Sequence, residues 1–167
     1  MWLTPKKEKF IRSVTISIQG KIKKMEVAWT SDMSVNDEKI DSQHKKLLNE
    51  LDNLRMELSS GVDVRPLRRT MDFFDKYVHE HLVYEEIYMK EHNFPGFDEH
   101  KKIHDSYRKY FENFKKKFHA AYSSSEFSSK DIKAMLTEAE VFLADWWTNH
   151  ILKEDHKYAV YIKSHSK

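Results

Sequence analysis

The stretch Glu38–Leu58 reads EKIDSQHKKLLNELDNLRMEL and has the pattern of an amphipathic helix. Its leucines recur every three or four residues, the spacing that places side chains on one helix face. The leucines are Leu47, Leu48, Leu51, Leu54 and Leu58. His44 precedes Leu47, Leu48 and Leu51 by three, four and seven residues, so it belongs to the same apolar face. We therefore predict a helix that presents one histidine to a protein core.

Three more segments have the same periodicity, and the few helix breakers fall between them. The second predicted helix runs from about 66 to 89, the third from about 97 to 122, and the fourth from the serine-rich loop 123–129 to about 161. Asn93-Phe94-Pro95-Gly96 separates the second helix from the third. Long helices joined by short loops pack as antiparallel neighbours. The predicted fold is all-α, an antiparallel up-down four-helix bundle with an N-terminal arm.

The composition excludes several other classes. The chain has 167 residues, which suits one domain, and it contains no cysteine. Disulfides, zinc-thiolate sites, iron–sulfur clusters and thiol nucleophiles are therefore excluded. Three glycines and three prolines are too few for a turn-rich β-fold. Ten histidines are the unusual feature, because histidine is the commonest metal-ligating side chain.

Basic charge is concentrated at the N-terminus. Residues 1–24 carry a net charge of +6, which leaves −4 for the rest of the chain. We expect residues 1–26 to form a basic extension and residues 27–167 to form the bundle, with Trp29 and Val35 packed on its helices. No motif supports nucleic-acid binding. The extension fits two interpretations: a segment without a folded role, or a contact to an anionic membrane surface or partner protein.

The extension does not read as a secretory signal. Its apolar residues are interrupted by Arg12, Thr15 and Ser17, and no small-residue cleavage site follows. No apolar run approaches the length of a membrane span. We therefore expect a cytoplasmic protein.

Two pairs of residues have the spacing of metal ligands. His100 and His104 lie four residues apart on the third predicted helix, as do His81 and Glu85 on the second. Residues four apart stack on one helix face, so each pair could bind one metal ion. Taken alone, each pair also fits a solvent-exposed helix surface.

The fourth helix contributes His150, but its carboxylate partner is ambiguous. Glu154 lies four residues further on and stacks above His150 in a regular helix. Asp155 lies five residues further on and is rotated by roughly 140° at the α-helical turn of 100° per residue. Spacing alone favours Glu154.

Taken together, these residues predict a metal centre. Each of the four helices directs at least one histidine from its apolar side into the same interior. Burying these groups without a cation would be costly, and bundle cores are where di-metal carboxylate sites occur. Of the other five histidines, His79 lies two residues from His81 and points to a different side, so we expect it to be exposed or at most to support a ligand. His92 lies at a helix end, and His119, His156 and His165 lack partners at ligand spacing, so we expect these four at the surface.

These motifs resemble the hemerythrin family in its bacterial single-domain form, over residues of about 27–163. The matching segments are Ile40–Lys45 with Trp29 upstream, His81–Glu86, His100-x-x-x-His104 and His150–Asp155. In that family the last carboxylate follows its histidine by five residues, so the resemblance selects Asp155 over Glu154.

The resemblance implies a cofactor of two iron ions with an oxo or hydroxo bridge. His100, His104 and His150 would hold one iron, His44 and His81 the other, and Glu85 and Asp155 would bridge them. The first iron is then saturated, whereas the second keeps an open position. Dioxygen would bind there end-on and reversibly as a hydroperoxide.

The protein would accordingly be an oxygen carrier, store or sensor and not an enzyme. The alternative is a di-iron enzyme or a protein that responds to nitric oxide or peroxide. Helix register places Leu47, Leu82 and Trp146 around the dioxygen pocket. Thr148 stands where the family usually has an apolar residue, so we expect a wetter pocket and faster oxidation to the di-ferric form.

Overall fold

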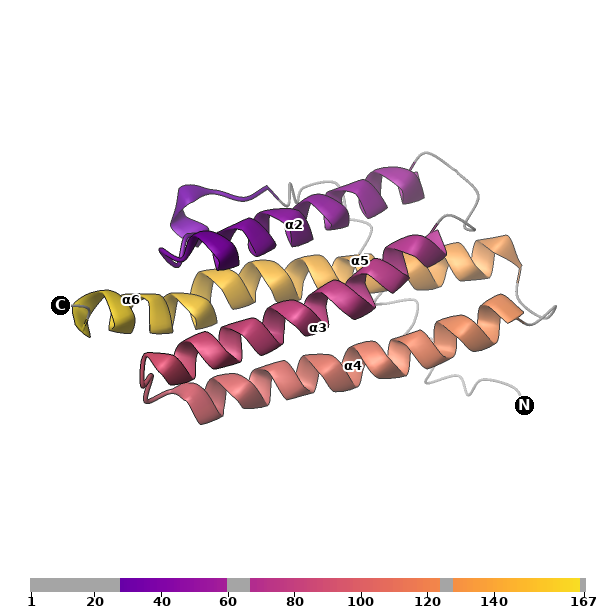
Figure 1. The fold of residues 1–167 in the computed structure, drawn as a ribbon. Helices are drawn as coiled ribbons and strands as arrows, with labels where there is room; N and C mark the ends of the chain where they lie inside the picture. The colour runs from indigo at the N-terminus through magenta and orange to yellow at the C-terminus, as the bar shows by residue number, and fades with distance from the viewer. Residues whose placement is uncertain (1–27, 60–66, 124–127, 166–167) are drawn as a thin grey trace, which may run out of the picture.

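Every long element in the described part of the chain is a helix. The computed structural model describes residues 28–59, 67–123 and 128–165. The predicted extension 1–26 and the predicted helix start at Pro66 lie outside these ranges. Within them there is no β-strand, and four long helical rods run lengthwise in alternating directions (Figure 1). The predicted all-α, antiparallel up-down four-helix bundle is confirmed.

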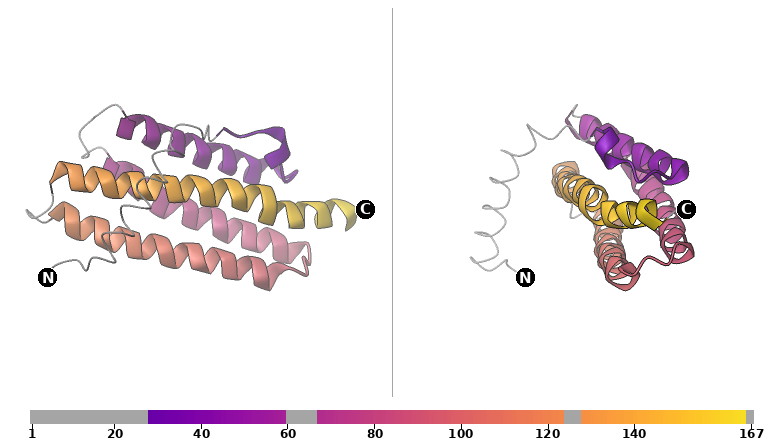
Figure 2. Two further views of the ribbon diagram at one scale, coloured as in Figure 1. Left: turned by 180° about the vertical axis from the view of Figure 1, so that it is seen from behind. Right: turned by 90° about the vertical axis from the view of Figure 1, so that its left-hand side faces the viewer.

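The helix boundaries are close to those predicted. The first three rods are α2 (Glu38–Ser59), α3 (Leu67–Glu91) and α4 (Phe97–Ser123). The fourth rod has three consecutive parts: α5 (Ser129–Asn149), a π-helical segment (His150–Asp155) and α6 (His156–His165). Contacts between α2 and α3, α3 and α4, α4 and α5, and α5 and α2 close the bundle, which Figure 2 shows from two further sides.

Local chemistry explains where two of the rods begin. Ser128 and Asp131 form a reciprocal capping box at the start of α5, as expected for serines before a helix. The turn between α3 and α4 needs Asn93 with a φ of 53° and a glycine at position 96. A Cβ atom on Gly96 would lie only 2.6 Å from the ring of Phe94, so a larger residue would displace that ring.

The core has two apolar clusters with a polar layer between them. The five predicted leucines of α2 are buried in the larger cluster. Ile40 and Met89 belong to the smaller cluster, near α6. Along α2, His44 lies between Ile40 of the smaller cluster and Leu47 of the larger one. A buried histidine therefore separates the parts of the helix that belong to the two clusters. The buried charge of the bundle is therefore concentrated in a layer with apolar packing at both ends.

The segment before α2 packs on the bundle as predicted. Trp29 contacts the larger cluster, and Val35 is buried in the smaller one. Asp41 accepts a hydrogen bond from the backbone N–H of Val35 at 2.9 Å, which fixes the approach to α2. No helix of the described ranges is long and apolar enough to cross a bilayer.

Candidate metal centre

The polar layer consists of the seven residues expected to bind metal. Each is at most 3 % exposed, and every long rod contributes at least one of them. They are His44, His81, Glu85, His100, His104, His150 and Asp155. The structure thus brings the whole predicted set together, although the residues are spread over more than one hundred positions of the sequence.

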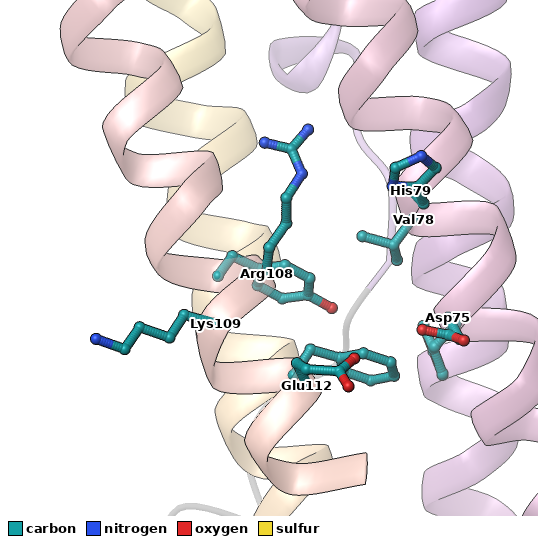
Figure 3. A pocket seen from close by; sticks show the side chains of 9 residues that line it. Asp75, Val78, His79, Arg108, Lys109 and Glu112 are labelled. Atoms are coloured by element: carbon teal, nitrogen blue, oxygen red, sulfur yellow. The ribbon is translucent and has the colours of Figure 1, made fainter. Parts of the chain in front are cut away.

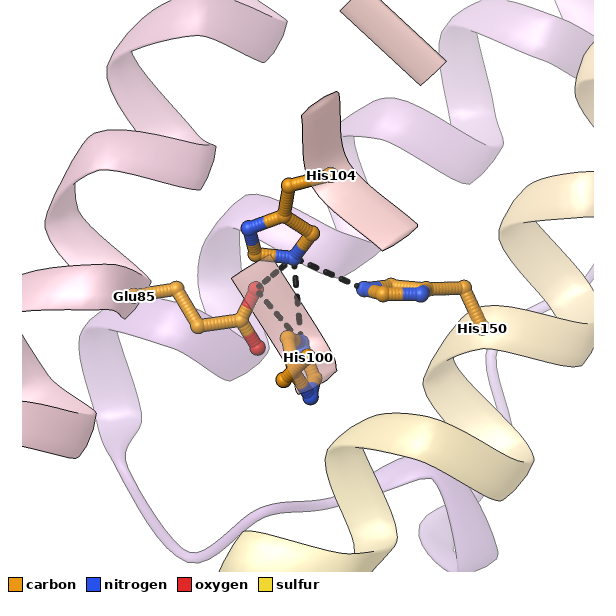
Figure 4. A group of neighbouring side chains, drawn as sticks. All are labelled: Glu85, His100, His104 and His150. Atoms are coloured by element: carbon orange, nitrogen blue, oxygen red, sulfur yellow. Dashed lines mark hydrogen bonds and ion pairs between the residues drawn. The ribbon is translucent and has the colours of Figure 1, made fainter. Parts of the chain in front are cut away.

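Three histidines form one half of the layer. Nε2 of His104 lies 3.0 Å from Nε2 of His100 and 3.0 Å from Nε2 of His150. Oε2 of Glu85 lies 3.3 Å from the same Nε2 of His104. Figure 4 shows these four side chains pointing toward one another from three rods. One ligand atom from each lies within 4.8 Å of all the others, which is compact enough for one metal ion.

His44 and His81 form the other half, again with Glu85. One ligand atom from each of these three residues also lies within 4.8 Å of the others. Their two rings meet edge to face at 4.8 Å. Glu85 is therefore shared by both groups, so its carboxylate can contact two ions.

Asp155 also spans the two halves. Its Oδ1 atom lies 3.0 Å from Nε2 of His150 and 3.4 Å from Nε2 of His100. Its Oδ2 atom lies 3.3 Å from Nε2 of His44. Both carboxylates thus have the placement of bridging ligands, and each half holds its own histidines.

The donor atoms fit a bound cation. Several buried atoms in the layer have no hydrogen-bond partner: Nδ1 and Nε2 of His44, Nε2 of His81, Oε2 of Glu85 and both carboxylate oxygens of Asp155. A buried polar atom without a partner is costly. Cations between these atoms would satisfy them, and a set of imidazoles and carboxylates suits iron, zinc or manganese.

The π-helical segment corrects the spacing argument for the last carboxylate. A π-helix is closed by hydrogen bonds between residues five apart, so it brings residue 155 back over His150. Asp155 is fully buried, whereas Glu154 is only partly buried and pairs with Lys157 on the surface at 2.6 Å. The preference for Glu154 assumed a regular α-helix, which this segment is not.

Burial and charge set the protonation of the layer. Burial lowers the pKa of His81 to about 3 and that of His100 to about 4. Burial alone would also lower the pKa of His104, but the neighbouring carboxylates of Glu85 and Glu86 outweigh it and raise that pKa to about 9. Glu85 has its pKa lowered to about 2, because the neighbouring histidines outweigh burial and the nearby Asp155. Neutral imidazoles and ionised carboxylates are the forms that bind metal, so a cation bound at His104 would displace the second proton of that ring.

Three side chains outside the ligand set hold ligands in place. Gln43 Oε1 lies 3.0 Å from Nδ1 of His81, and Glu86 Oε1 lies 3.0 Å from Nδ1 of His104. The hydroxyl of Tyr158 donates a hydrogen bond to Glu85 at 2.6 Å. None of these three residues was predicted from the sequence. Gln43 and Glu86 directly adjoin proposed ligands, a local signal, whereas Tyr158 reaches Glu85 from another rod.

The residues expected around a dioxygen pocket have different environments. Leu47 and Leu82 are fully buried. Trp146 is only partly buried and stacks on His150 with ring centroids 4.3 Å apart. The structure places Trp147 in the core instead, 5.4 Å from the ring of His81. Thr148 is partly buried, and its Oγ1 atom is buried without a partner.

The remaining histidines lie on the surface, as expected. His79, His92, His119, His156 and His165 are all exposed. Ligand spacing together with the apolar face of each helix therefore separated the five buried histidines from the five exposed ones.

The fold is a four-helix bundle with a buried, histidine-rich layer that could hold metal ions, and comparison with known proteins gives the family. A family model described as "Hemerythrin HHE cation binding domain" matches residues 35–162. The chain belongs to this hemerythrin family, as the sequence motifs indicated. The match contains all seven residues of the polar layer.

Named relatives align with most of the chain at low identity. A bacteriohemerythrin of Stenotrophomonas maltophilia is 25% identical over 139 residues, which cover 83% of each chain. A myohemerythrin of Theromyzon tessulatum is 27% identical over 131 residues, which cover 78% of this chain and 88% of the relative. A bacteriohemerythrin of Pseudomonas paraeruginosa is 24% identical over 132 residues.

Proposed function

We propose that this protein binds dioxygen reversibly at a di-iron centre held by the polar layer. His100, His104 and His150 would hold one iron, and His44 and His81 the other. Glu85 and Asp155 would bridge the two irons, with an oxo or hydroxo group as the third bridge. The iron held by two histidines keeps an open position, which would take dioxygen end-on.

The placement of the two shared carboxylates carries this proposal. Oδ1 of Asp155 faces His150 and Oδ2 faces His44, so one carboxylate meets both histidine groups. Glu85 reaches both groups from α3 with one oxygen, since its Oε2 lies 3.3 Å from His104 and 3.8 Å from His81, while its Oε1 accepts from Tyr158. A centre for a single ion would need neither carboxylate to span the layer. Membership of the hemerythrin family supports iron as the metal.

The side chains in and around the polar layer favour reversible binding of dioxygen over an enzymatic reaction with it. Trp147 lies 5.4 Å from the ring of His81, and Leu47 and Leu82 are fully buried in the same apolar cluster, an environment that would keep water from the second iron. The layer has five histidines and only two carboxylates, unlike the carboxylate-rich di-iron sites of the ferritin type. These features support a binding protein over the alternative, a di-iron enzyme or a protein responsive to nitric oxide or peroxide.

Anaerobic reconstitution with ferrous iron tests the proposal. We expect two irons per chain and, after air is admitted, a visible charge-transfer band that disappears under vacuum. The variant His44→Ala should lose the band, whereas His119→Ala, which changes an exposed histidine, should keep it. Irreversible bleaching, or fewer than two irons per chain, would contradict reversible binding at a di-iron centre.

A carrier, a store and a sensor would all use this same chemistry. A cytoplasmic location and attachment through the basic extension 1–24 also stay predictions from the sequence. Removal of residues 1–24 would test attachment: equal binding of both proteins to anionic vesicles would contradict a membrane contact.

A further inference from the structure

We propose that Glu86 is a positioning residue that strengthens His104 as a metal ligand, and that Arg108 limits this effect. The inference rests on the metal centre of the proposed function. It concerns two side chains that lie outside the ligand set and reach the protein surface. Glu86 is 15% exposed and Arg108 is 27% exposed.

The contact between Glu86 and His104 determines which ring nitrogen is free. Oε1 of Glu86 lies 3.0 Å from Nδ1 of His104. An ionised carboxylate only accepts hydrogen bonds, so Nδ1 must carry the proton and donate it. In the neutral ring that binds metal, the lone pair of Nε2 then points into the layer, where Nε2 of His100 and of His150 lie 3.0 Å away. Glu86 thereby selects the tautomer and ring orientation that a bound cation requires.

This contact distinguishes His104 from its neighbours. His81 has the neutral amide of Gln43 at the same position, and Nδ1 of both His44 and His150 has no partner. Among the buried histidines of the described ranges, only His104 has a carboxylate against Nδ1 in the contacts found. A carboxylate draws the Nδ1 proton more strongly than an amide does, so it leaves more electron density on Nε2. His104 should therefore bind metal more strongly than His81.

Arg108 acts on the same carboxylate oxygen from the outer side. Its Nη2 lies 2.8 Å from Oε1 of Glu86, and its Nη1 lies 2.9 Å from Oδ1 of Asp105. The guanidinium draws charge from the oxygen that also receives the His104 proton. Removal of Arg108 should therefore make Glu86 a stronger acceptor and His104 a stronger ligand. Substitution of Glu86 should therefore weaken metal binding by His104, whereas substitution of Arg108 should strengthen it.

Arg108 also connects this chain of contacts to the surface. It lines a groove of about 360 Å³ between α3 and α4, whose floor includes Val78 and Tyr107. Figure 3 shows the guanidinium at one end of the groove, on the same side as His79. Because Arg108 is not itself a proposed ligand, its substitution changes the surroundings of Glu86 and leaves every proposed ligand in the sequence.

Cobalt(II)-loaded full-length protein gives a test that does not depend on oxygen binding. The rate of Co²⁺ loss to an excess of chelator is measured for wild type, Glu86→Gln and Arg108→Met. We expect Glu86→Gln to lose one of its two ions about 10- to 100-fold faster, the usual effect of removing such a partner. Arg108→Met should lose that ion more slowly than wild type. The paramagnetically shifted Nδ1–H proton resonance of His104 should move in opposite directions in the two variants.

Matched controls remove the same charges from exposed positions. Glu80→Gln lies on α3 and Lys109→Met on α4, and both should release Co²⁺ at the wild-type rate. Near-ultraviolet circular dichroism confirms that each variant is folded. Equal rates for Glu86→Gln and Glu80→Gln would overturn the inference. Faster loss in both Glu86→Gln and Arg108→Met would also overturn it, because a purely packing role predicts that result.

The outcome separates this inference from the proposed function. If wild type binds two ions but releases both at the same rates as Glu86→Gln, Glu86 has no role in holding the metal, and the di-metal centre of the proposed function stands. If wild type holds no second ion, both the role of Glu86 and the proposed function are overturned.

Discussion

Asp155 lies 3.0 Å from His150, five positions earlier in the sequence, because the helix between them is a π-helix. A regular α-helix would turn the carboxylate of residue 155 away from the histidine and direct Glu154 toward it. The π-helical segment therefore determines which acid enters the layer. Such segments often occur at functional sites.

The two neighbouring acids should differ sharply on substitution. We expect Asp155→Ala to lower the metal content below two ions per chain and to weaken metal binding at least 10-fold, because a buried bridging carboxylate is lost. Glu154→Ala removes only a surface ion pair with Lys157 and should keep full metal content. Elemental analysis after dialysis measures both. Equal losses in the two variants would show that residue 155 is not a ligand.

Metal loading should stabilise the folded protein strongly. The apoprotein buries donor atoms without partners, and only the folded chain brings them together. A metal at 1,000 times its dissociation constant adds about 4 kcal/mol to the free energy of unfolding. Anaerobic thermal unfolding with and without ferrous iron measures the increment. It should be clearly smaller in His44→Ala, which loses a ligand of one of the two ions, and persist in full in His119→Ala; an equal increment in both would place the metal elsewhere.

Glu140 predicts a pH dependence of stability that is independent of the metal. This residue is buried on α5, and burial raises its pKa to about 7, with Arg55 offsetting part of the effect. In the unfolded chain the same carboxyl ionises near its ordinary value of 4.5. Between these values the unfolded chain has released a proton that the folded chain still holds, so stability falls as the pH rises.

Substitution of Glu140 by glutamine removes this loss. Relative to wild type, Glu140→Gln should gain roughly 2 kcal/mol of stability as the pH rises from about 4.5 to about 7. Urea unfolding of the apoprotein at several pH values measures the difference. Glu138→Gln changes an exposed acid on the same helix and should show no such trend. A constant difference between wild type and Glu140→Gln across this range would refute the prediction.

Thr148 is expected to speed oxidation of the centre. Its Oγ1 atom is buried and lacks a partner in the described part of the chain, so it offers a place for water near the layer. Thr148→Val removes that hydroxyl at nearly constant shape and should slow conversion to the di-ferric form. The decay of the oxygenated visible spectrum measures this rate. Thr137→Val is the control, because that hydroxyl already donates to the carbonyl of Lys133. An unchanged decay rate would exclude a role for Thr148.

Most of the ligand set could be predicted from helical spacing because spacing is local. His81 with Glu85, and His100 with His104, lie four residues apart in regular α-helices, so each pair shares a face in any bundle. His44 could be placed because the leucines that follow it define the buried face of α2. These inferences need no knowledge of the neighbouring helices.

Residues that depend on contacts between helices were less predictable. Register favoured Trp146 for the pocket, yet Trp147 is the tryptophan buried against His81, since that contact depends on how α5 packs on α3. The hydrogen bond from Tyr158 to Glu85 also joins two rods far apart in the sequence. No spacing rule within one helix predicts either contact.

The sequence by itself determined the four helices, their buried faces and the separation of the five buried histidines from the five exposed ones. Periodicity and ligand spacing are properties of single helices, and they persist whatever the packing. Only the tertiary structure decided that Asp155 and not Glu154 enters the layer, that both carboxylates span two histidine groups, and that Glu86 and Arg108 flank His104. These features depend on the local hydrogen-bond register of the last rod and on distances between rods, which arise only when the bundle closes.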